Sequence, residues 1–354
     1  MVVGGGVVGA ATALALGRRG VATTLLEAGD RLALGASGTN SGILHTGFDS
    51  TPGELETRLI LRAAELRDPV LERLEIPVVR CGAVLRPRSD EDRATVAGLA
   101  GNGLAELDEQ GDLQVPGEAV TDPVAYTRAL AGASGAEVLT GARVDAIERA
   151  GDGLTLGLAS GDRVHCQVAV NCAGLHADDV ARLAGDDSFG IYPRKGEFFV
   201  FEPPDGEPLE RILLPVPTKR TKGVLVFPTV DGKVIAGPTA HDQDDKDDWS
   251  VRDEAWDEVV PKAVEMLPGL EGSEPIAAYA GLRPAGRDGV NYLIGARDRF
   301  INVAAIRSTG LTASLGIAEY VAALVEEQGV QLGPERGLAP VAAPQSEEPW
   351  WRHD

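Results

Sequence analysis

The segment MVVGGGVVGAATALALGRRGVATTLLEAGD, residues 1–30, decides the fold. Gly4, Gly6 and Gly9 form the pattern G-x-G-x-x-G, directly after an apolar Val-Val pair and directly before an Ala/Leu-rich stretch that is typical of a helix. A second apolar run follows at residues 21–26, and Glu27 stands at about the distance expected for an acid that binds a ribose hydroxyl. This order of strand, glycine turn, helix and strand predicts a dinucleotide-binding unit.

Each position of the fingerprint has its own physical task. Gly4 permits a tight turn, Gly6 lets a diphosphate approach the backbone, and Gly9 lets the helix pack closely on the strand. The positive end of the helix then stabilises the diphosphate charge, and Glu27 would repel a 2′-phosphate. Only three residues precede Gly4, whereas strands usually have about five, so either the strand is short or the true start lies upstream.

No second G-x-G-x-x-G follows a strand-like run, which disfavours a reductase with one nucleotide site for flavin and another for NAD(P)H. The fingerprint by itself leaves FAD and NAD open.

Composition narrows the class of protein. The 354 residues are 44% hydrophobic and 25% charged, as in an ordinary globular protein, and the net charge of −21 disfavours nucleic acid and anionic lipid as partners. The three cysteines have no metal-binding spacing, and no apolar run approaches the ~20 residues of a membrane span. We therefore expect a cytoplasmic protein with no membrane span and no metal site, in which local Arg or Lys side chains would be needed to bind an anionic substrate.

The stretch GTNSGILHTGFD, residues 38–49, places His45 among three glycines. A backbone without Cβ atoms can come very close to a ligand, and a histidine beside it could then reach that ligand. The alternative is a flexible surface loop with an incidental histidine.

Further along the chain, residues 54–75 predict an amphipathic helix up to Pro69, and residues 88–120 predict an exposed helical excursion. Residues 168–185 predict a second strand-to-helix turn at Ala173 and Gly174, with His176 as a surface or capping group. Residues 191–240 predict antiparallel strands that could roof a pocket, and the acidic run 241–249 predicts a solvated loop. A closing helix is predicted from about Leu311, and the tail beyond it lacks periodicity.

Six motifs in this order carry a family resemblance: GTNSGILHTGFDSTPGEL, VNCAGLHAD, YPRKGEF, GVLVFPTVDG, AGLRPA and FINVAAIRSTGLTAS. Over roughly residues 2–328 the chain resembles the D-amino-acid-oxidase-type superfamily of FAD-dependent oxidoreductases, and more closely the glycerol-3-phosphate dehydrogenase and L-2-hydroxyglutarate dehydrogenase/oxidase branch. The resemblance implies FAD, bound non-covalently or covalently, and a mixed α/β (α+β) fold. It implies a Rossmann-like FAD-binding domain (1–76, 121–190 and 280–332), a mixed, largely antiparallel-sheet substrate-binding domain (77–120 and 191–279), and a flexible C-terminal tail (333–354).

The resemblance also implies roles for single residues. The ADP half of FAD would be held by Gly4, Gly6, Gly9 and Glu27, with the backbone of Val144 at the adenine. The remaining FAD-binding positions would be Ser37, Thr39, Asn40, Ser41, Ala173, Gly174, Gly310, Leu311 and Thr312. His45 matches a histidine near the reactive face of the flavin, and Arg283 matches an arginine that binds the substrate anion. Lys222 and Arg307 are weaker candidates for a second anion contact.

Two departures from the family pattern leave the substrate open. No cysteine-rich iron-sulfur module follows the closing helix, and Arg307 stands where similar sequences more often have an acidic or amide residue.

The resulting hypothesis is hydride transfer from a small anionic hydroxy substrate, a 2-hydroxy acid or glycerol 3-phosphate, to flavin N5. His45 would be the base and Arg283 the anion clamp. An amino-acid or amine oxidase, a non-catalytic FAD-binding electron-transfer subunit and an NAD-dependent dehydrogenase are the alternatives. The electron acceptor, oxygen, a quinone or a redox protein, stays open.

Overall fold

The computed structural model describes residues 1–217, 223–289, 291–339 and 348–352. Its first sheet has six strands in the order β20-β21-β13-β1-β2-β9, and only the pair β20–β21 is antiparallel. These strands are β1 (Val2–Val3), β2 (Thr24–Leu26), β9 (Glu137–Leu139), β13 (Ala169–Asn171), β20 (Leu293–Arg297) and β21 (Phe300–Ala304). A parallel sheet with β1 in its interior confirms the predicted Rossmann-like unit.

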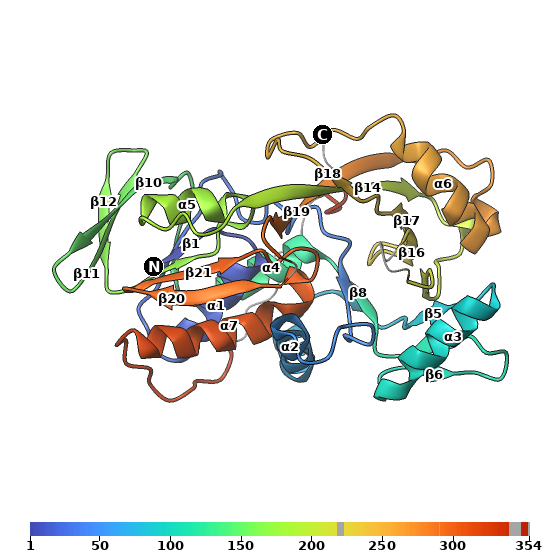
Figure 1. The fold of residues 1–354 in the computed structure, drawn as a ribbon, viewed down its shortest axis with the longest axis horizontal. Coiled ribbons are helices and arrows are strands. Elements are labelled where there is room, and N and C mark those ends of the chain that lie inside the picture. Colours follow the sequence, from blue (N-terminus) through green and yellow to red (C-terminus); the bar gives the residue numbers. More distant parts are fainter. Residues whose placement is uncertain (218–222, 290, 340–347, 353–354) are drawn as a thin grey trace.

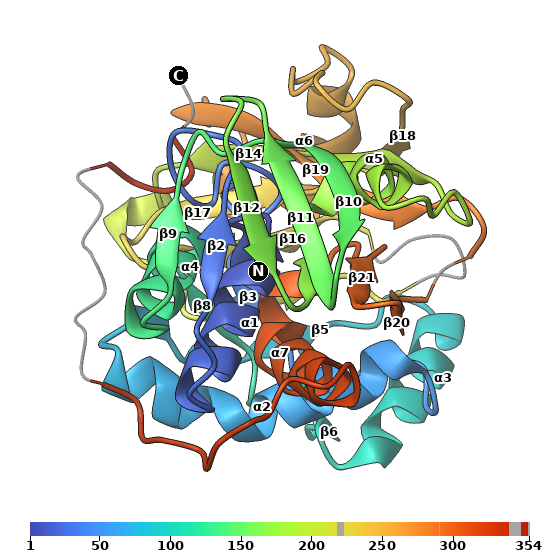
Figure 2. The ribbon, with the colours of Figure 1, turned by 90° about the vertical axis from the view of Figure 1, so that its left-hand side faces the viewer.

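The four inner strands of this sheet, β21, β13, β1 and β2, are covered on both faces, which explains why most of their residues are apolar and buried. Val2 and Leu25 pack toward the helices, while their neighbours Val3 and Leu26 pack toward a small antiparallel sheet. The helices are α1 (Val7–Arg18), α2 (Leu55–Arg73), α4 (Pro123–Ala133) and α7 (Gly310–Glu327). The opposite face carries β10 (Val144–Ala150), β11 (Gly153–Leu158), β12 (Arg163–Cys166) and α5 (Ala177–Leu183) (Figures 1 and 2).

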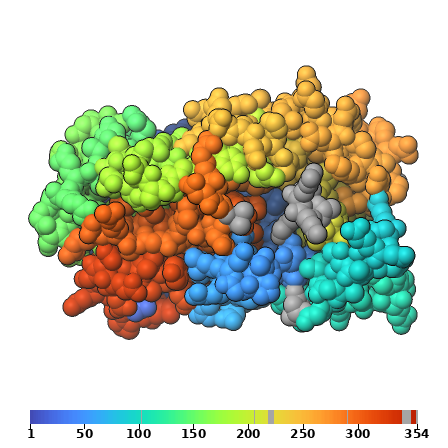
Figure 3. Space-filling model, in the orientation of Figure 1, coloured from blue at the N-terminus to red at the C-terminus, as the bar shows by residue number. Residues whose placement is uncertain are grey.

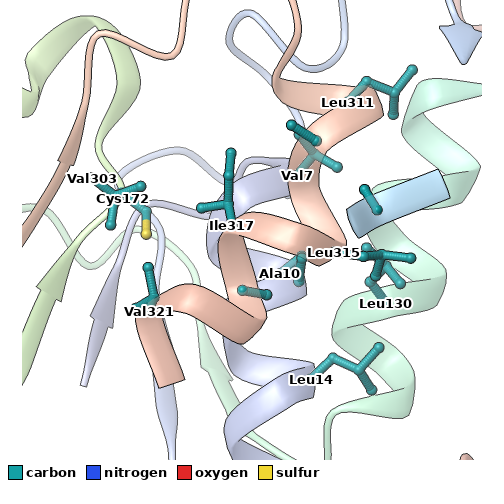
Figure 4. Close-up of a cluster of buried hydrophobic side chains, with 14 of the residues drawn as sticks. Val7, Ala10, Leu14, Leu130, Cys172, Val303, Leu311, Leu315, Ile317 and Val321 are labelled. Carbon is teal, nitrogen blue, oxygen red and sulfur yellow. The ribbon is translucent and has the colours of Figure 1, made fainter. Parts of the chain in front are cut away.

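The helical layer buries its apolar stripes against the strands. Figure 4 shows α1 and α7 side by side, with Val7 and Ala10 of α1 near Ile317 and Leu315 of α7 and with Leu130 of α4 close by. This packing fixes the starts of α1 and α7 relative to the strands.

The second sheet has nine strands and forms the other lobe. Its order is β18-β14-β17-β16-β15-β5-β7-β6, and β19 pairs with β14. The strands are β5 (Ala83–Leu85), β6 (Glu106–Leu107), β7 (Leu113–Val115), β14 (Ile191–Phe201), β15 (Ile212–Leu214), β16 (Leu225–Pro228), β17 (Val234–Gly237), β18 (His241–Asp242) and β19 (Ala277–Gly286). All of its pairings are antiparallel except β15–β5.

Successive side chains of β14 point to opposite faces of this second sheet, and each face is covered by a different layer. Phe199 and Phe201 pack under α6 (Ala255–Met266), whereas Phe198 and Val200 face the cluster that contains Ile43. On the surface, green and red residues of the first lobe lie at one end, and gold and cyan residues around α6 and α3 (Asp90–Leu99) lie at the other (Figure 3).

Short elements complete the chain. A three-stranded antiparallel sheet joins β3 (Ile43–Leu44), β8 (Ala119–Thr121) and β4 (Val78–Val79). Single 3-10 turns occupy Ala100–Asn102, Gly174–His176, Pro204–Gly206 and Pro268–Leu270. Among the helices of the described part of the chain, none has both the length and the apolar character needed to span a bilayer.

Two predicted elements differ from the structure, and one proposed domain boundary falls inside a strand. Residues 88–120 are an α-helix followed by β6, β7 and the start of β8, so the predicted helical excursion is wrong beyond α3. The helix α2 continues past Pro69 to Arg73. The domain boundary proposed at residue 280 cuts through β19, which pairs along its length with β14 in the second sheet.

The acidic run 241–249 is held to the protein by ion pairs. Lys195 of β14, almost fully buried, donates to Asp248 at 2.8 Å, and Lys246 reaches Asp178 at 2.7 Å and Asp179 at 2.9 Å. A loop read from its composition as solvated is therefore anchored to β14 and α5.

The described residues of the C-terminal tail also contact the rest of the protein. Gly333 donates its N–H to the carbonyl of Arg19 at 2.8 Å, and Trp350 and Trp351 are only 4% and 3% exposed. Trp350 meets the ring of Tyr279 edge-on at 5.8 Å, and both tryptophans belong to the cluster on the inner face of the second sheet. The two adjacent tryptophans in an otherwise polar segment were the sequence feature that could have predicted this burial.

Replacing Trp351 by Phe tests this anchor. The indole N–H donates to the two carboxylate oxygens of Asp231 at 3.2 and 3.1 Å, and Phe keeps the ring but loses the donor. We expect the free energy of unfolding to fall by about 1 kcal/mol in urea denaturation, since Asp231 is exposed. In a double-mutant cycle, Asp231→Asn should lower the free energy of unfolding less in the Phe variant than in wild type. If the two substitutions lower it additively, Trp351 and Asp231 do not interact.

Candidate functional site

The turn after β1 requires glycine at two points. Gly4 has φ +109°, its N–H donates to Leu26 O at 2.7 Å, and a Cβ there would lie 2.4 Å from Cys172 O. A Cβ on Gly9 would lie 2.0 Å from Gly4 O. The backbone of α1 therefore sits directly against the turn, which brings the start of the helix close to the carboxyl ends of β1 and β13.

Two neighbouring side chains accept hydrogen bonds from the backbone of this turn and of the first residue of α1. Glu27 accepts from Gly5 N–H and Gly29 N–H, both at 2.7 Å, and Ser37 Oγ accepts from Val7 N–H at 2.9 Å. The N-cap of α1 is Gly6, and its first turn consists of apolar residues and glycine. The positive end of α1 is therefore left for an anionic group.

The other predicted cofactor residues gather near this turn or along the loop that leads to His45. Asn40 Oδ1 accepts from Gly42 N–H at 2.9 Å, and Ser41 Oγ accepts from Ile43 N–H at 3.4 Å. Ala173 and Gly174 follow β13 at the carboxyl edge of the sheet, and Val144 lies buried at the start of β10. Thr39 is the notable one: its Oγ1 is buried and has no hydrogen-bond partner among the described residues.

A second helix start lies beside this loop. The first turn of α7 begins with Gly310 and the buried Leu311, and the cap residue Thr309 turns its hydroxyl to Glu56 at 2.5 Å instead of to the helix. Thr312 Oγ1 accepts from His45 N–H at 3.0 Å and donates to Ile43 O at 3.3 Å. These bonds tie α7 to the segment that carries His45.

His45 is paired with a residue that sequence reasoning missed. Its Nδ1 lies 2.8 Å from Oε2 of Glu118, whose side chain is fully buried. The other oxygen, Oε1, accepts from Thr46 N–H at 2.7 Å and from Thr46 Oγ1 at 3.0 Å. Glu118 was assigned to an exposed excursion, although its place between Gly117 and the apolar start of β8 was a local sign of burial.

The imidazole of His45 also borders a small cavity. Its side chain keeps 24% of its surface exposed. The cavity is lined by His45, Phe48, Asp49, Leu85, Leu214, Pro215, Pro217 and Leu225. Because Nδ1 is occupied by a buried carboxylate, Nε2 is the nitrogen available to a molecule in this space.

Arg283 lies on β19 opposite Arg194 of β14. Its guanidinium donates to two backbone carbonyls, Arg194 O at 3.4 Å and Thr239 O at 3.1 Å. Among the described residues no carboxylate comes within ion-pair distance of it. Burial, reinforced by the charge of Arg194, lowers the pKa of Arg283 to about 10. An anion at this point would give this half-buried guanidinium a direct ionic partner.

Of the two weaker candidates for a second anion contact, the structure describes only Arg307. Arg307 has φ +52°, donates its N–H to Pro284 O at 3.1 Å, and forms an ion pair with Glu56. Its backbone thus touches the residue next to Arg283, but its charge is already partnered. Lys222 lies outside the described residues.

Comparison with known proteins accounts for this combination of a glycine-rich turn, two helix starts without acidic residues in their first turns, and a histidine beside α7. The family model described as FAD dependent oxidoreductase matches residues 1–324. The chain belongs to this family. It is an enzyme, its cofactor is FAD, and the resemblance inferred from the six motifs is confirmed.

Individual relatives agree with the family assignment. The chain is 28% identical over 347 residues to a glycerol 3-phosphate dehydrogenase of Caloramator mitchellensis, covering 90% of this chain and 72% of that protein. It is 28% identical over 266 residues to an L-2-hydroxyglutarate dehydrogenase of Salmonella houtenae, covering 68% of this chain and 63% of that one. The solved structure of the L-alpha-glycerophosphate oxidase from Mycoplasma pneumoniae, with FAD bound, superposes with a TM-score of 0.88 at 24% identity and covers 98% of both chains.

The site residues fit this cofactor. The first turns of α1 and α7 contain no acidic residue, and the buried hydroxyl of Thr39 needs a partner that the described residues do not supply. When bound, FAD supplies the oxidising ring that accepts a hydride.

Replacing Thr39 by Val separates cofactor binding from folding. Val has the same shape but lacks the hydroxyl, so removal of an unpartnered buried group should leave the stability of the FAD-free protein unchanged or higher. The dissociation constant of FAD should rise about tenfold, as expected for one lost hydrogen bond. Thr12→Val is the matched control, because Thr12 Oγ1 donates to Val8 O at 2.8 Å inside α1 and its loss should affect stability alone. Unchanged FAD affinity in the Thr39 variant would contradict the assignment.

Proposed function

We propose that this enzyme oxidises the CH–OH group of a small anionic hydroxy substrate, a 2-hydroxy acid such as L-2-hydroxyglutarate, or glycerol 3-phosphate. The observation that carries the proposal is the His45–Glu118 pair beside a cavity, with Nδ1 held at 2.8 Å by a buried carboxylate. Such a pair is suited to take a proton from a hydroxyl group.

The two proposed catalytic residues have different tasks. His45 Nε2 accepts the hydroxyl proton as the hydrogen on the same carbon leaves as hydride. Arg283 binds the substrate's carboxylate or phosphate, because a planar guanidinium can hold two oxygens at once and because this one lacks a carboxylate partner among the described residues.

The presence of a histidine base backed by a buried carboxylate favours a hydroxyl over an amine as the oxidised group. A neutral amine can lose hydride without a strong base, whereas an alcohol must give up its proton in the same process. The glycerol 3-phosphate and L-2-hydroxyglutarate relatives act on CH–OH groups, and this supports the same choice here.

Anaerobic bleaching of the flavin tests the proposal. The purified protein, with its flavin absorbance recorded first, is mixed without oxygen with L- and D-2-hydroxyglutarate, other 2-hydroxy acids, glycerol 3-phosphate and amino acids. We expect a hydroxy acid or glycerol 3-phosphate to bleach the flavin fastest. Fastest bleaching by an amino acid would replace the proposal with amine oxidation, and a flavin that none of these reduces would indicate an electron-transfer subunit.

A further inference from the structure

The partner of His45 lies far from it in the sequence and has no assigned role. Glu118 stands 73 positions away, at the junction of a turn with β8, and β8 pairs with β3 immediately before His45. The pairing of Leu44 with Ala119 brings the two side chains together. The contact is therefore set by strand register, which makes it rigid.

Glu118 is arranged to remain fixed in one orientation. Its side chain is fully buried, and Thr46 donates twice to Oε1, through the backbone at 2.7 Å and the hydroxyl at 3.0 Å. Oε2 is then directed to His45 Nδ1 at 2.8 Å. An ionised carboxylate can only accept hydrogen bonds, so the proton of a neutral imidazole must sit on Nδ1 and the lone pair must sit on Nε2.

We propose that Glu118 is a positioning residue that holds His45 in the tautomer in which Nε2 is free to accept the substrate's proton. The inference rests on the proposed function for its catalytic meaning. In the step, the O–H bond breaks and its proton bonds to Nε2. The C–H bond on the same carbon breaks, its hydrogen leaves with both electrons as hydride, and the carbon becomes a carbonyl; FAD, when bound, would supply the hydride acceptor. The charge of Glu118 stabilises the resulting imidazolium.

Other groups around His45 have different roles. Arg67 of α2 donates to the backbone carbonyl of His45 at 3.3 Å, and burial lowers the pKa of Arg67. Thr312 meets the backbone N–H of His45, and Asp49 borders the same cavity. Among the described residues, Glu118 alone forms a hydrogen bond with the imidazole ring of His45.

Replacing Glu118 by Gln reverses the tautomer without changing the shape. The Gln carbonyl can still accept from Thr46, but its NH₂ group donates to Nδ1 and so moves the ring proton to Nε2. We expect the rate of anaerobic flavin reduction to fall about 10²-fold or more with FAD content unchanged, since the base loses its lone pair on the substrate side.

Two comparisons separate positioning from a merely structural role. Glu118→Asp retains a carboxylate that can only accept a hydrogen bond, so it should recover part of the rate of flavin reduction. Thr46→Val removes one donor to Oε1 and leaves Oε2 on the ring, so it should lower the rate far less than Glu118→Gln. The proposal would be overturned if the Asp variant reduced its flavin no faster than the Gln variant, or if the Gln variant kept the wild-type rate.

A measurement on the wild-type holoenzyme does not depend on activity or on any Glu118 variant folding. With ¹⁵N-labelled histidine, the chemical shifts of the ring nitrogens report the tautomer of each of the five histidines, and the His45→Asn variant identifies the signal of His45. A proton on Nδ1 is expected, and a proton on Nε2 would overturn the proposal. If no hydroxy substrate bleaches the flavin, the proposed function fails, while this spectrum still decides the role of Glu118.

Discussion

Replacing His45 by Ala is expected to slow anaerobic flavin reduction by the best substrate about 10²- to 10⁴-fold, the usual contribution of a general base. The cofactor should stay bound, because the contact that ties this segment to α7 is made by the backbone N–H of His45 to Thr312 at 3.0 Å. Stopped-flow absorbance under anaerobic conditions measures the rate, and the flavin spectrum measures cofactor content.

The Ala variant also leaves the buried carboxylate of Glu118 without its ring partner. His45→Asn is therefore the better matched variant, because the amide nitrogen of Asn can donate to Oε2 in place of Nδ1 but cannot serve as a base. The rate of flavin reduction should fall in both variants, and only the Ala variant should also be less stable than wild type. If the Asn variant bleaches as fast as wild type, His45 is not the base.

Replacing Arg283 by Ala is expected to lower kcat/KM about 30-fold or more. Removing one partner of a buried charge pair costs at least about 2 kcal/mol, and the anionic end of the substrate would lose its cation. Arg283→Lys should recover part of KM but less of kcat, since an ammonium cannot grip two oxygens in a plane. Steady-state kinetics are measured with the best substrate and with an uncharged alcohol analogue. Neither substitution should change kcat/KM for the analogue, because it has no anionic group for Arg283 to bind.

The strand opposite Arg283 offers a test that keeps the arginine. A Cβ on Gly196 would lie 2.1 Å from Nη2 and 2.8 Å from Cζ of Arg283, so Gly196→Ala should displace the guanidinium and raise KM. Gly295→Ala is the matched control, because a Cβ on that strand residue meets nothing within 4 Å. Wild-type KM in the Gly196 variant would remove Arg283 from the substrate site.

The parts of the fold that the sequence predicted correctly are those with local signals. The turn at Gly4 to Gly9, the strand end at Asn171 and the start of α7 at Gly310 each follow from a glycine or an apolar run within a few residues. The family resemblance came from the same short motifs.

The features that sequence reasoning missed depend on distant pairing. Glu118 lies in an acidic, glycine-containing region, and only its register with β3 buries it against His45. The strand β19 joins β14 across about 80 intervening residues, and the tryptophans of the tail find Tyr279 and Asp231 in another lobe. Local composition cannot predict such contacts, because each of these residues is buried by a segment that lies far away in the sequence.

The position of β1 inside the first sheet has a consequence for synthesis of the protein. Its neighbour β13 begins at Ala169, and α1 packs against α7, which begins at Gly310. The glycine turn at residues 4–9 thus leaves the ribosome long before the elements that complete it. At about 5–20 residues per second, roughly 15–60 s separate the two events. During that time the nascent chain carries the glycine turn without β13 and α7, so we expect FAD to bind only when almost the whole chain has been made.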